Sequence, residues 1–290
     1  MAGGLKEVRE RISSVQNTMQ ITSAMKMVSV AKLRRAQDAI TRMRPYADKL
    51  QSVLANVSSS LASGEGTYSE QRPVKKVLLV AVTSNRGLCG GFNNNIIKEV
   101  QVAMGDTSKQ YHVLPLGKKA NDAFRRRAEL RPEGFAEDTW NIFEDLNFTA
   151  AQAVGDVILE QFANGTYDEV RLVYNKFVNA AVQIPTNEAF LPLLPDTTEE
   201  AAGETEYIFE PSREEIVERI IPNSLKIQLY KGLLESHASE HGARMTAMHQ
   251  ATENASELLR ELRISYNKAR QAAITTEILE IVAGSEALDG

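Results

Sequence analysis

Apolar residues near the N-terminus recur at alternating spacings of three and four, which is the pattern of a coiled-coil helix. The seam, meaning the line of side chains that faces a partner helix, is predicted to consist of Leu5, Val8, Ile12, Val15, Met19, Leu33, Ala36, Ile40, Met43, Ala47, Leu50, Leu54, Val57 and Leu61. Ser63 and Gly64 end the pattern. At 1.5 Å per residue, such a helix would run about 85 to 90 Å. Pro45 predicts a kink rather than an end, because the seam continues beyond it.

The segment between Met19 and Leu33 departs from a simple seam. The seam positions within it are polar, and they are Thr22, Lys26 and Ser29. Its apolar residues are spread around the helix instead, and they are Ile21, Ala24, Met25, Met27, Val28, Val30 and Ala31. One partner helix could not cover so wide an apolar surface, so we expect another structure to enclose this segment.

A second long helix is predicted after Pro222, because residues 223–282 contain no further proline and only Gly232 and Gly242 as weak interior points. Its predicted seam is Ala243, Ala247, Ala251, Ala255, Leu258, Leu262, Ser265, Ala269 and Ala272. Small side chains at these positions permit close approach of another helix. Long isolated helices are unstable in water, so we expect the two terminal helices to pair with each other.

The middle of the chain follows an α/β pattern instead. Predicted strands are 77–82, 111–116 and 169–176, and predicted helices are 93–104, 118–127 and 149–162. Segments 183–189 and 205–209 are expected to form a closing hairpin around a solvated acidic loop, 196–206. The predicted domains are therefore a helical shaft formed by 1–62 with 211–290, and an α/β domain formed by 73–210.

Charge and composition narrow the classes of function. The net charge of −5 gives no argument for nucleic-acid binding, and the chain has no run of about 18 apolar residues that could cross a bilayer. The lone thiol, Cys89, rules out an internal disulfide. The N-terminus leads directly into the amphipathic pattern, without a signal-peptide core or a transit segment, which favours a bacterial cytoplasmic chain.

Two motifs invite a chemical interpretation. The glycine-rich turn 87–91 follows a predicted strand, but it matches neither GxGxxG nor GxxxxGK[ST], so tight strand-to-helix packing is favoured over phosphate binding. No His/Asp partner in the sequence supports Cys89 as a nucleophile. His237 and His241 have the spacing of metal ligands on a helix, yet the sequence is HASEH rather than HExxH, and a polar helix face is favoured.

Four segments carry a family resemblance: 11–33 (RISSVQNTMQITSAMKMVSVAKL), 84–93 (SNRGLCGGFN), 173–177 (VYNKF) and 236–284. The last contains SHASEHGARMTAMHQATENA and YNKARQAAITTEILEIVAG. Together these segments span nearly the whole chain, and they resemble the γ subunit of the F-type ATP synthase of bacteria.

The resemblance implies an antiparallel coiled coil of the terminal helices and a Rossmann-like central α/β domain. The coiled coil would turn inside a ring of α and β subunits and couple proton flow through the membrane sector to ATP synthesis. The chain itself would have no catalytic centre, cofactor or metal, and would bind neither nucleotide nor nucleic acid. Its partners would be the α, β and ε subunits and the c-ring, on the cytoplasmic face of the inner membrane.

The resemblance also implies contact residues. Those carried over as contacts to the β subunit are Met25, Arg244, Gln271, Thr275 and Glu277. Tyr207 and Glu210 match positions near the c-ring and the ε subunit. The apolar tip, 278–283, would enter an apolar sleeve at the top of the ring of α and β subunits. The alternative for each contact residue is plain coiled-coil surface.

Two other classes of function fit parts of the pattern: a generic coiled-coil scaffold with an α/β head, and a small-molecule-binding α/β enzyme with helical arms. A two-helix scaffold needs only one apolar stripe, so the apolar surface all around residues 21–31 disfavours the scaffold.

Overall fold

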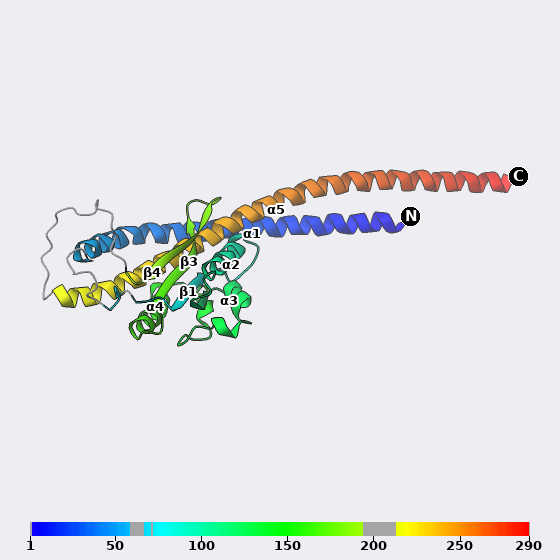
Figure 1. Ribbon diagram of the computed structural model, residues 1–290. Coiled ribbons are helices and arrows are strands. Elements are labelled where there is room, and N and C mark those ends of the chain that lie inside the picture. Colours follow the sequence, from blue (N-terminus) through cyan, green and yellow to red (C-terminus); the bar gives the residue numbers. More distant parts are fainter. Residues whose placement is uncertain (1, 59–66, 71, 194–212, 290) are drawn as a thin grey trace. The chain divides into compact units, whose positions relative to one another are not determined.

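The computed structural model describes residues 2–58, 67–70, 72–193 and 213–289 (Figure 1). Two compact units form within the chain. The first comprises Met1–Ser29 with Met245–Gly290, and the second comprises Val30–Arg244. The two units divide each of the long helices, α1 (Ala2–Ser58) and α5 (Arg213–Asp289). One part of each helix belongs to the first unit and the other part to the second.

In the first unit, α1 and α5 pair as antiparallel helices (Figure 1). The Arg9 guanidinium donates to the Tyr266 hydroxyl at 2.8 Å, and the Thr22 and Thr252 hydroxyls lie 2.8 Å apart. Going from Arg9 to Thr22 advances 13 residues along α1 (22 − 9), while the partner retreats 14 residues along α5 (266 − 252). Opposed numbering of this kind is the signature of antiparallel pairing, as predicted.

Burial confirms the predicted seam of α1 from Leu5 to Leu50, whereas Leu54, Val57 and Leu61 are residues whose side chains the structure does not describe. Each of Leu5, Val8, Ile12, Val15 and Met19 is half-buried, while nearly all residues between them are exposed. The seam continues through buried Thr22 and Ser29 in the first unit, and through buried Leu33, Ala36 and Ile40 in the second. The helix also continues through Pro45, as expected.

The predicted seam of α5 is wrong by one residue over part of its length. Leu258 is 39% exposed, whereas Leu259 is only 7% exposed, and Ser265 and Ala272 are exposed. The covered residues after Met248 are Ala251, Thr252, Ala255, Leu259, Leu262, Tyr266, Ala269, Ala273 and Thr276. A seam must alternate spacings of four and three to stay on one side of a helix. Alanines at a constant spacing of four drift around the helix, so Ala243, Ala247 and Ala251 are only half-buried while Ala255 is buried.

The predicted start of the second long helix is also corrected. Helix α5 begins at Arg213 and runs through Pro222 without ending. A proline removes one backbone hydrogen bond, but the residues on either side of it are held by packing: Ile221 and Leu225 are both buried in the core of the second unit.

The second unit is built on a four-stranded sheet of order β2-β1-β3-β4, formed by β1 (Lys76–Val82), β2 (Gln110–Leu116), β3 (Glu169–Phe177) and β4 (Gln183–Leu191). Strand β1 is parallel to β2 and β3, and β4 returns antiparallel to β3. The first strand of the predicted closing hairpin, 183–189, is present as β4, and its pairing with β3 was not predicted. Segment 205–209, its predicted partner, lies outside the described residues, as does the acidic loop 196–206.

Three helices accompany the sheet: α2 (Phe92–Ala103), α3 (Lys118–Phe124) and α4 (Phe148–Ala163). All three were predicted within a few residues, although α3 ends before the three arginines that were included in it. Two short 3₁₀ turns, Ala128–Leu130 and Thr139–Asn141, lie between α3 and α4.

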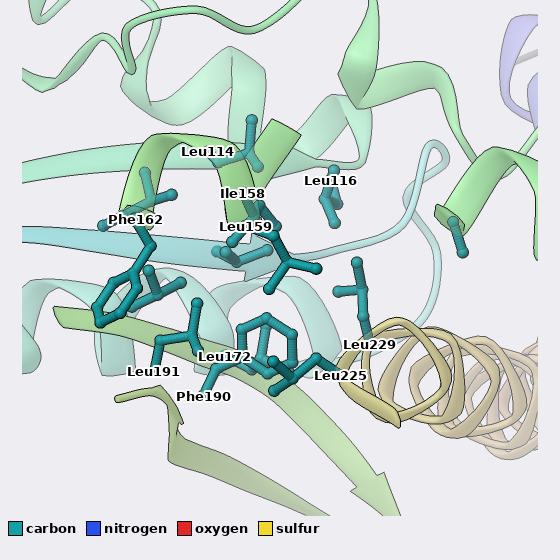
Figure 2. Close-up of a cluster of buried hydrophobic side chains, with 14 of the residues drawn as sticks. Leu114, Leu116, Ile158, Leu159, Phe162, Leu172, Phe190, Leu191, Leu225 and Leu229 are labelled. Carbon is teal, nitrogen blue, oxygen red and sulfur yellow. The ribbon is translucent and has the colours of Figure 1, made fainter. Parts of the chain in front are cut away.

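Strand β1 is buried on both faces, and its alternate residues belong to two separate cores. On one face, Val77, Leu79 and Ala81 pack with residues of α2 and α3. On the other, Leu78, Val80 and Val82 pack with α4 and with Leu225, Leu229 and Leu233 of α5. Figure 2 shows Leu225 of α5 beside Phe190 of β4, and Leu229 of the same helix belongs to the same core. The early part of α5 is therefore a structural layer of the α/β domain.

Close backbone approach joins α5 to the sheet further along. A Cβ atom on Gly242 would lie 3.2 Å from Ala180 at the turn between β3 and β4, and the Ser239 hydroxyl donates to the Asn175 carbonyl of β3 at 2.9 Å. Gly242, which the sequence marked as a weak point inside the helix, is thus the position where α5 and the turn are in contact. Within the described residues, no helix combines enough length with enough apolar character to span a lipid bilayer.

Candidate functional site

The turn between β1 and α2 carries the glycine-rich motif. Two of its residues have left-handed backbone conformations, Leu88 at φ 63° and Gly90 at φ 59°. Leucine adopts such a conformation rarely, because its Cβ approaches the backbone. Leu88 is nevertheless 64% exposed. Contacts of its side chain within this chain therefore do not offset the backbone strain.

A buried polar network holds the inside of this turn. The Ser84 hydroxyl donates to the Arg86 carbonyl at 2.6 Å, and the Ser84 amide donates to Asn93 Oδ1 at 2.9 Å. Asn93 Nδ2 in turn donates to Cys89 Sγ at 3.1 Å. Burial raises the pKa of the Cys89 thiol, which favours the unreactive protonated form. The motif is therefore a packed strand-to-helix turn, which agrees with the structural interpretation of the sequence.

Arg244 of α5 reaches this turn from outside. Its Nη2 donates to the carbonyls of Arg86 at 3.1 Å and of Gly87 at 3.2 Å. Its Nη1 donates to Glu240 Oε1 at 2.5 Å and faces His241 Nδ1 at 3.4 Å. The residue is only 7% exposed, and Glu240 is equally buried. A buried cation thus joins a helix face to two backbone carbonyls of the turn.

The two histidines continue this network along α5. Their Nε2 atoms lie 3.1 Å apart, and His237 stacks on Phe143 with ring centroids 6.0 Å apart. Because an arginine can only donate, His241 Nδ1 accepts, so His241 Nε2 carries the proton and donates to His237. Burial, reinforced by the nearby cations Lys32 and Arg244, lowers the pKa of His237 to about 4 and that of His241 to about 3. Both rings are therefore neutral at pH 7.

Two neutral imidazoles at this spacing could chelate a metal, but their surroundings oppose it. The positive charges of Lys32 and Arg244 that lower both pKa values would also repel a metal ion. Among the described residues, no cluster of three or more His, Cys, Asp or Glu side chains could hold a metal. The two histidines are instead linked to each other and to Arg244 in one hydrogen-bond network.

The contact residues implied by the sequence fall into different environments. In the first unit, Met25 is half-buried on α1, whereas Gln271, Thr275 and Glu277 are exposed on α5. In the second unit, Arg244 is buried and bonded within the chain. Tyr207 and Glu210 lie outside the described residues.

The register of the coiled coil places the exposed residues near its end. Paired residue numbers sum to 275 for Arg9 with Tyr266 (9 + 266) and to 274 for Thr22 with Thr252 (22 + 252). Ala2, the first residue of α1, therefore lies opposite position 272 or 273 (274 − 2 or 275 − 2). Thr275 and Glu277 thus lie beyond the position opposite Ala2, the first residue of α1, and residues 277–285 are all exposed.

Apart from the half-buried Met25, the apolar residues of α1 between Met19 and Ser29 are exposed in the first unit, and what encloses them stays a prediction. Ile21 is 60%, Met27 66% and Val28 57% exposed. Sequence reasoning missed the internal network of Arg244. The only available signal was the spacing of four between Glu240 and Arg244, which is common on solvated helices.

Comparison with known proteins agrees with this architecture. The family model described as ATP synthase matches residues 4–288. The chain is 57% identical to the ATP synthase gamma chain of Flavobacterium johnsoniae and 44% identical to that of Chlorobium phaeobacteroides, in each case over 99% of both chains.

Solved structures show the same fold. A chain from the Euglena gracilis mitochondrial ATP synthase matches with a TM-score of 0.67 at 22% identity, over 99% of this chain and 95% of that chain. A chain from the central stalk and c-ring structure of the Tetrahymena thermophila mitochondrial ATP synthase matches with a TM-score of 0.57 at 25% identity, over 80% of this chain and 99% of that chain. Full-length similarity to the bacterial sequences, together with the antiparallel helices and the central sheet, shows that the chain belongs to the ATP synthase gamma chain family.

Proposed function

We propose that the chain is the central-stalk rotor subunit of a bacterial F-type ATP synthase, with no catalytic centre of its own. It would couple proton flow through the membrane sector to ATP synthesis at the β subunits, and would regulate ATP hydrolysis. The observation that carries the proposal is an antiparallel two-helix rod with large apolar side chains left exposed off its seam, within a family whose members are ATP synthase gamma chains.

The exposed apolar residues support a rod that works inside a ring of other subunits. Met27 and Val28 are more than half exposed, although both are large and apolar. Such side chains gathered on one helix mark a surface that a partner covers. The proposed partners are the α and β subunits around the rod, with the ε subunit and the c-ring at the membrane end. The chain would then lie peripherally at the cytoplasmic face of the inner membrane.

A rotor of this kind transmits torque because its binding free energy to each catalytic subunit differs with its orientation. The two helices present unlike faces, so three equivalent catalytic subunits around them would each meet a different surface. Rotation would then change the nucleotide affinity of each subunit in turn. We propose Met25, Gln271, Thr275 and Glu277 as contacts to the β subunit, supported by the exposure of the last three. For Tyr207 and Glu210 we propose contacts to the c-ring or the ε subunit.

Reconstitution tests the assignment. The chain is mixed with cognate α and β subunits, and magnesium-dependent ATP hydrolysis and the stoichiometry of the complex are measured. One copy per α₃β₃ ring with stimulated hydrolysis is expected, and failure of both assembly and stimulation would refute the rotor assignment. Gln271→Ala should lower the stimulated rate with unchanged helix content, whereas Lys98→Ala, on the exposed side of α2, should leave it unchanged.

A further inference from the structure

The four Nη hydrogens of the Arg244 guanidinium all have acceptors within the chain. Nη1 carries two hydrogens, which point to Glu240 and His241, and Nη2 carries two more, which point to the carbonyls of Arg86 and Gly87. A planar group with donors fixed in a fork can satisfy four acceptors in this way. A lysine ammonium has only three hydrogens on one atom, so it could keep the ion pair with Glu240 but not the whole set of bonds.

The two carbonyls lie immediately before the strained residue of the turn. Leu88 follows Gly87 directly and has φ 63° with its side chain exposed. Ser84 also donates to the Arg86 carbonyl, so that carbonyl receives one bond from the turn itself and one from α5. Arg244 therefore bonds α5 to the backbone that sets the direction of Leu88.

We propose that Arg244 is a positioning residue, which fixes the turn 86–88 to α5 so that the exposed Leu88 moves with this helix as one rigid body. The proposal rests on the rotor function proposed above, in which α5 turns. A turn that could open independently would yield under load, and part of the torque would be lost as local deformation. The bonds from Arg244 to the carbonyls of Arg86 and Gly87, called the clamp below, would stiffen the β1-to-α2 turn next to Leu88, which is both strained and exposed.

Direct contact between Arg244 and a partner is disfavoured by the same geometry. The side chain is 7% exposed, and Glu240, which is equally buried, requires its charge. Moving Arg244 to a partner would remove the cation that is hydrogen-bonded to the buried Glu240 carboxylate, which is unfavourable. An effect of Arg244 on coupling would therefore act through the turn.

Cys89 provides a direct reporter of the clamp. It is the only cysteine of the chain, lies within the turn, and is 1% exposed. A thiol reagent such as 5,5′-dithiobis(2-nitrobenzoate) can therefore react only when the turn opens. The reaction rate of the full-length chain measures opening without requiring any partner.

Three variants separate the clamp from general stability. Arg244→Lys keeps the charge next to Glu240 but loses the fork, so labelling of Cys89 should become about tenfold faster or more. Glu240→Gln keeps the bonds from Arg244 to the turn, so labelling should accelerate much less. Lys226→Gln removes the ion pair of α5 with Asp156, far along the helix from the turn, and should leave the labelling rate unchanged.

Circular dichroism and thermal unfolding are measured beside each labelling rate, so that global unfolding is recognised. Unchanged labelling in a folded Arg244→Lys chain would overturn the proposal. Acceleration by Lys226→Gln as large as that by Arg244→Lys would overturn it too. Should Arg244→Lys fail to fold, Arg244→Gln combined with Glu240→Gln removes the fork without leaving a buried charge, and the same criteria apply to it.

A second arm uses the complete membrane-bound ATP synthase assembled with the variant chain. Arg244→Lys should lower proton pumping per ATP hydrolysed while hydrolysis and assembly persist, and the control Lys226→Gln should keep the normal ratio. Fast labelling with a normal pumping ratio would show that the clamp exists but does not position the turn for coupling. Failure of the wild-type chain to assemble would instead refute the rotor function and leave the labelling result standing.

Discussion

The hydroxyl oxygens of Thr22 on α1 and Thr252 on α5 lie 2.8 Å apart, at a seam position where a coiled coil usually has apolar side chains. Each hydroxyl also lies near a carbonyl of its own helix, Thr252 at 2.7 Å from Met248 and Thr22 at 3.1 Å from Met19, so either threonine can donate the bond between the helices while the other donates to its own helix. A polar pair within an apolar seam lowers stability but favours one register, because only one alignment satisfies both groups.

A double-mutant cycle with Thr22→Val and Thr252→Val should therefore show a coupling of about 1 kcal/mol, the usual size for a neutral hydrogen bond. Urea unfolding followed by circular dichroism measures it. Thr18 is the matched control, because its hydroxyl bonds only to the Ser14 carbonyl of its own helix. A coupling of Thr18→Val with Thr252→Val as large as that of the Thr22 pair would contradict the assigned bond.

Acid should destabilise the second unit through His237 and His241. Their pKa values are lowered to about 4 and about 3 in the folded chain, so the unfolded chain binds protons more readily. Stability then falls as the pH drops below the unfolded value near 6.5, and the loss is complete only below the folded values. At pH 5 each histidine should account for about 2 kcal/mol of lost stability.

Thermal unfolding of the wild type and of His241→Gln between pH 7.5 and 5 tests this expectation. The variant should show a shallower loss of stability over that range. Burial raises the pKa of Glu240, which acts in the opposite direction, and the comparison of the two chains cancels that contribution. Identical pH profiles for both chains would reject the assignment of neutral, buried imidazoles.

Sequence reasoning located elements well where a repeated pattern carried the information. The α1 seam and the buried strand β1 each contain several residues of one period, so each residue reinforces the others. The α5 seam was wrong between Leu258 and Leu259, because alanine is compatible with both a seam and its flank. Nothing in the sequence shows that Arg244 turns inward, since that depends on carbonyls of residues 86 and 87, far away in the chain.

Gly117, between β2 and α3, should not tolerate a side chain. Its φ is 124°, and an added Cβ would lie 2.1 Å from the Thr83 carbonyl oxygen. Gly117→Ala should therefore cost several kcal/mol, about 3 or more, because both the backbone and the neighbouring strand would have to move. Calorimetric unfolding of the full chain measures the change.

Gly284 in α5 is the matched control, since its added Cβ would meet nothing within 4 Å. Gly284→Ala should stabilise the helix locally by roughly 0.5 to 1 kcal/mol, because alanine is the better helix former. Equal destabilisation by the two substitutions would show that steric conflict at Gly117 is not the cause.

The end of α5 should be stable only when a partner covers it. By the register of the Arg9 and Thr22 pairs, the first residue of α1, Ala2, lies opposite position 272 or 273, and residues 277–285 are exposed. Four large apolar side chains there, Ile278, Leu279, Ile281 and Val282, are about half exposed or more. A single helix without a packed face is marginal in water, so backbone amides of 274–289 should exchange within seconds in the isolated chain.

Hydrogen exchange followed by mass spectrometry measures this, with residues 225–241 of the same helix as the internal control. Those residues pack into the core of the second unit, so their amides should be protected in every sample. In the assembled complex the amides of 274–289 should gain protection of about tenfold or more, since burial of the apolar tip would then stabilise the helix. Strong protection of the tip in the isolated chain would show that the tip is already packed against other residues of this chain. It would contradict the expectation that only a partner stabilises residues 274–289.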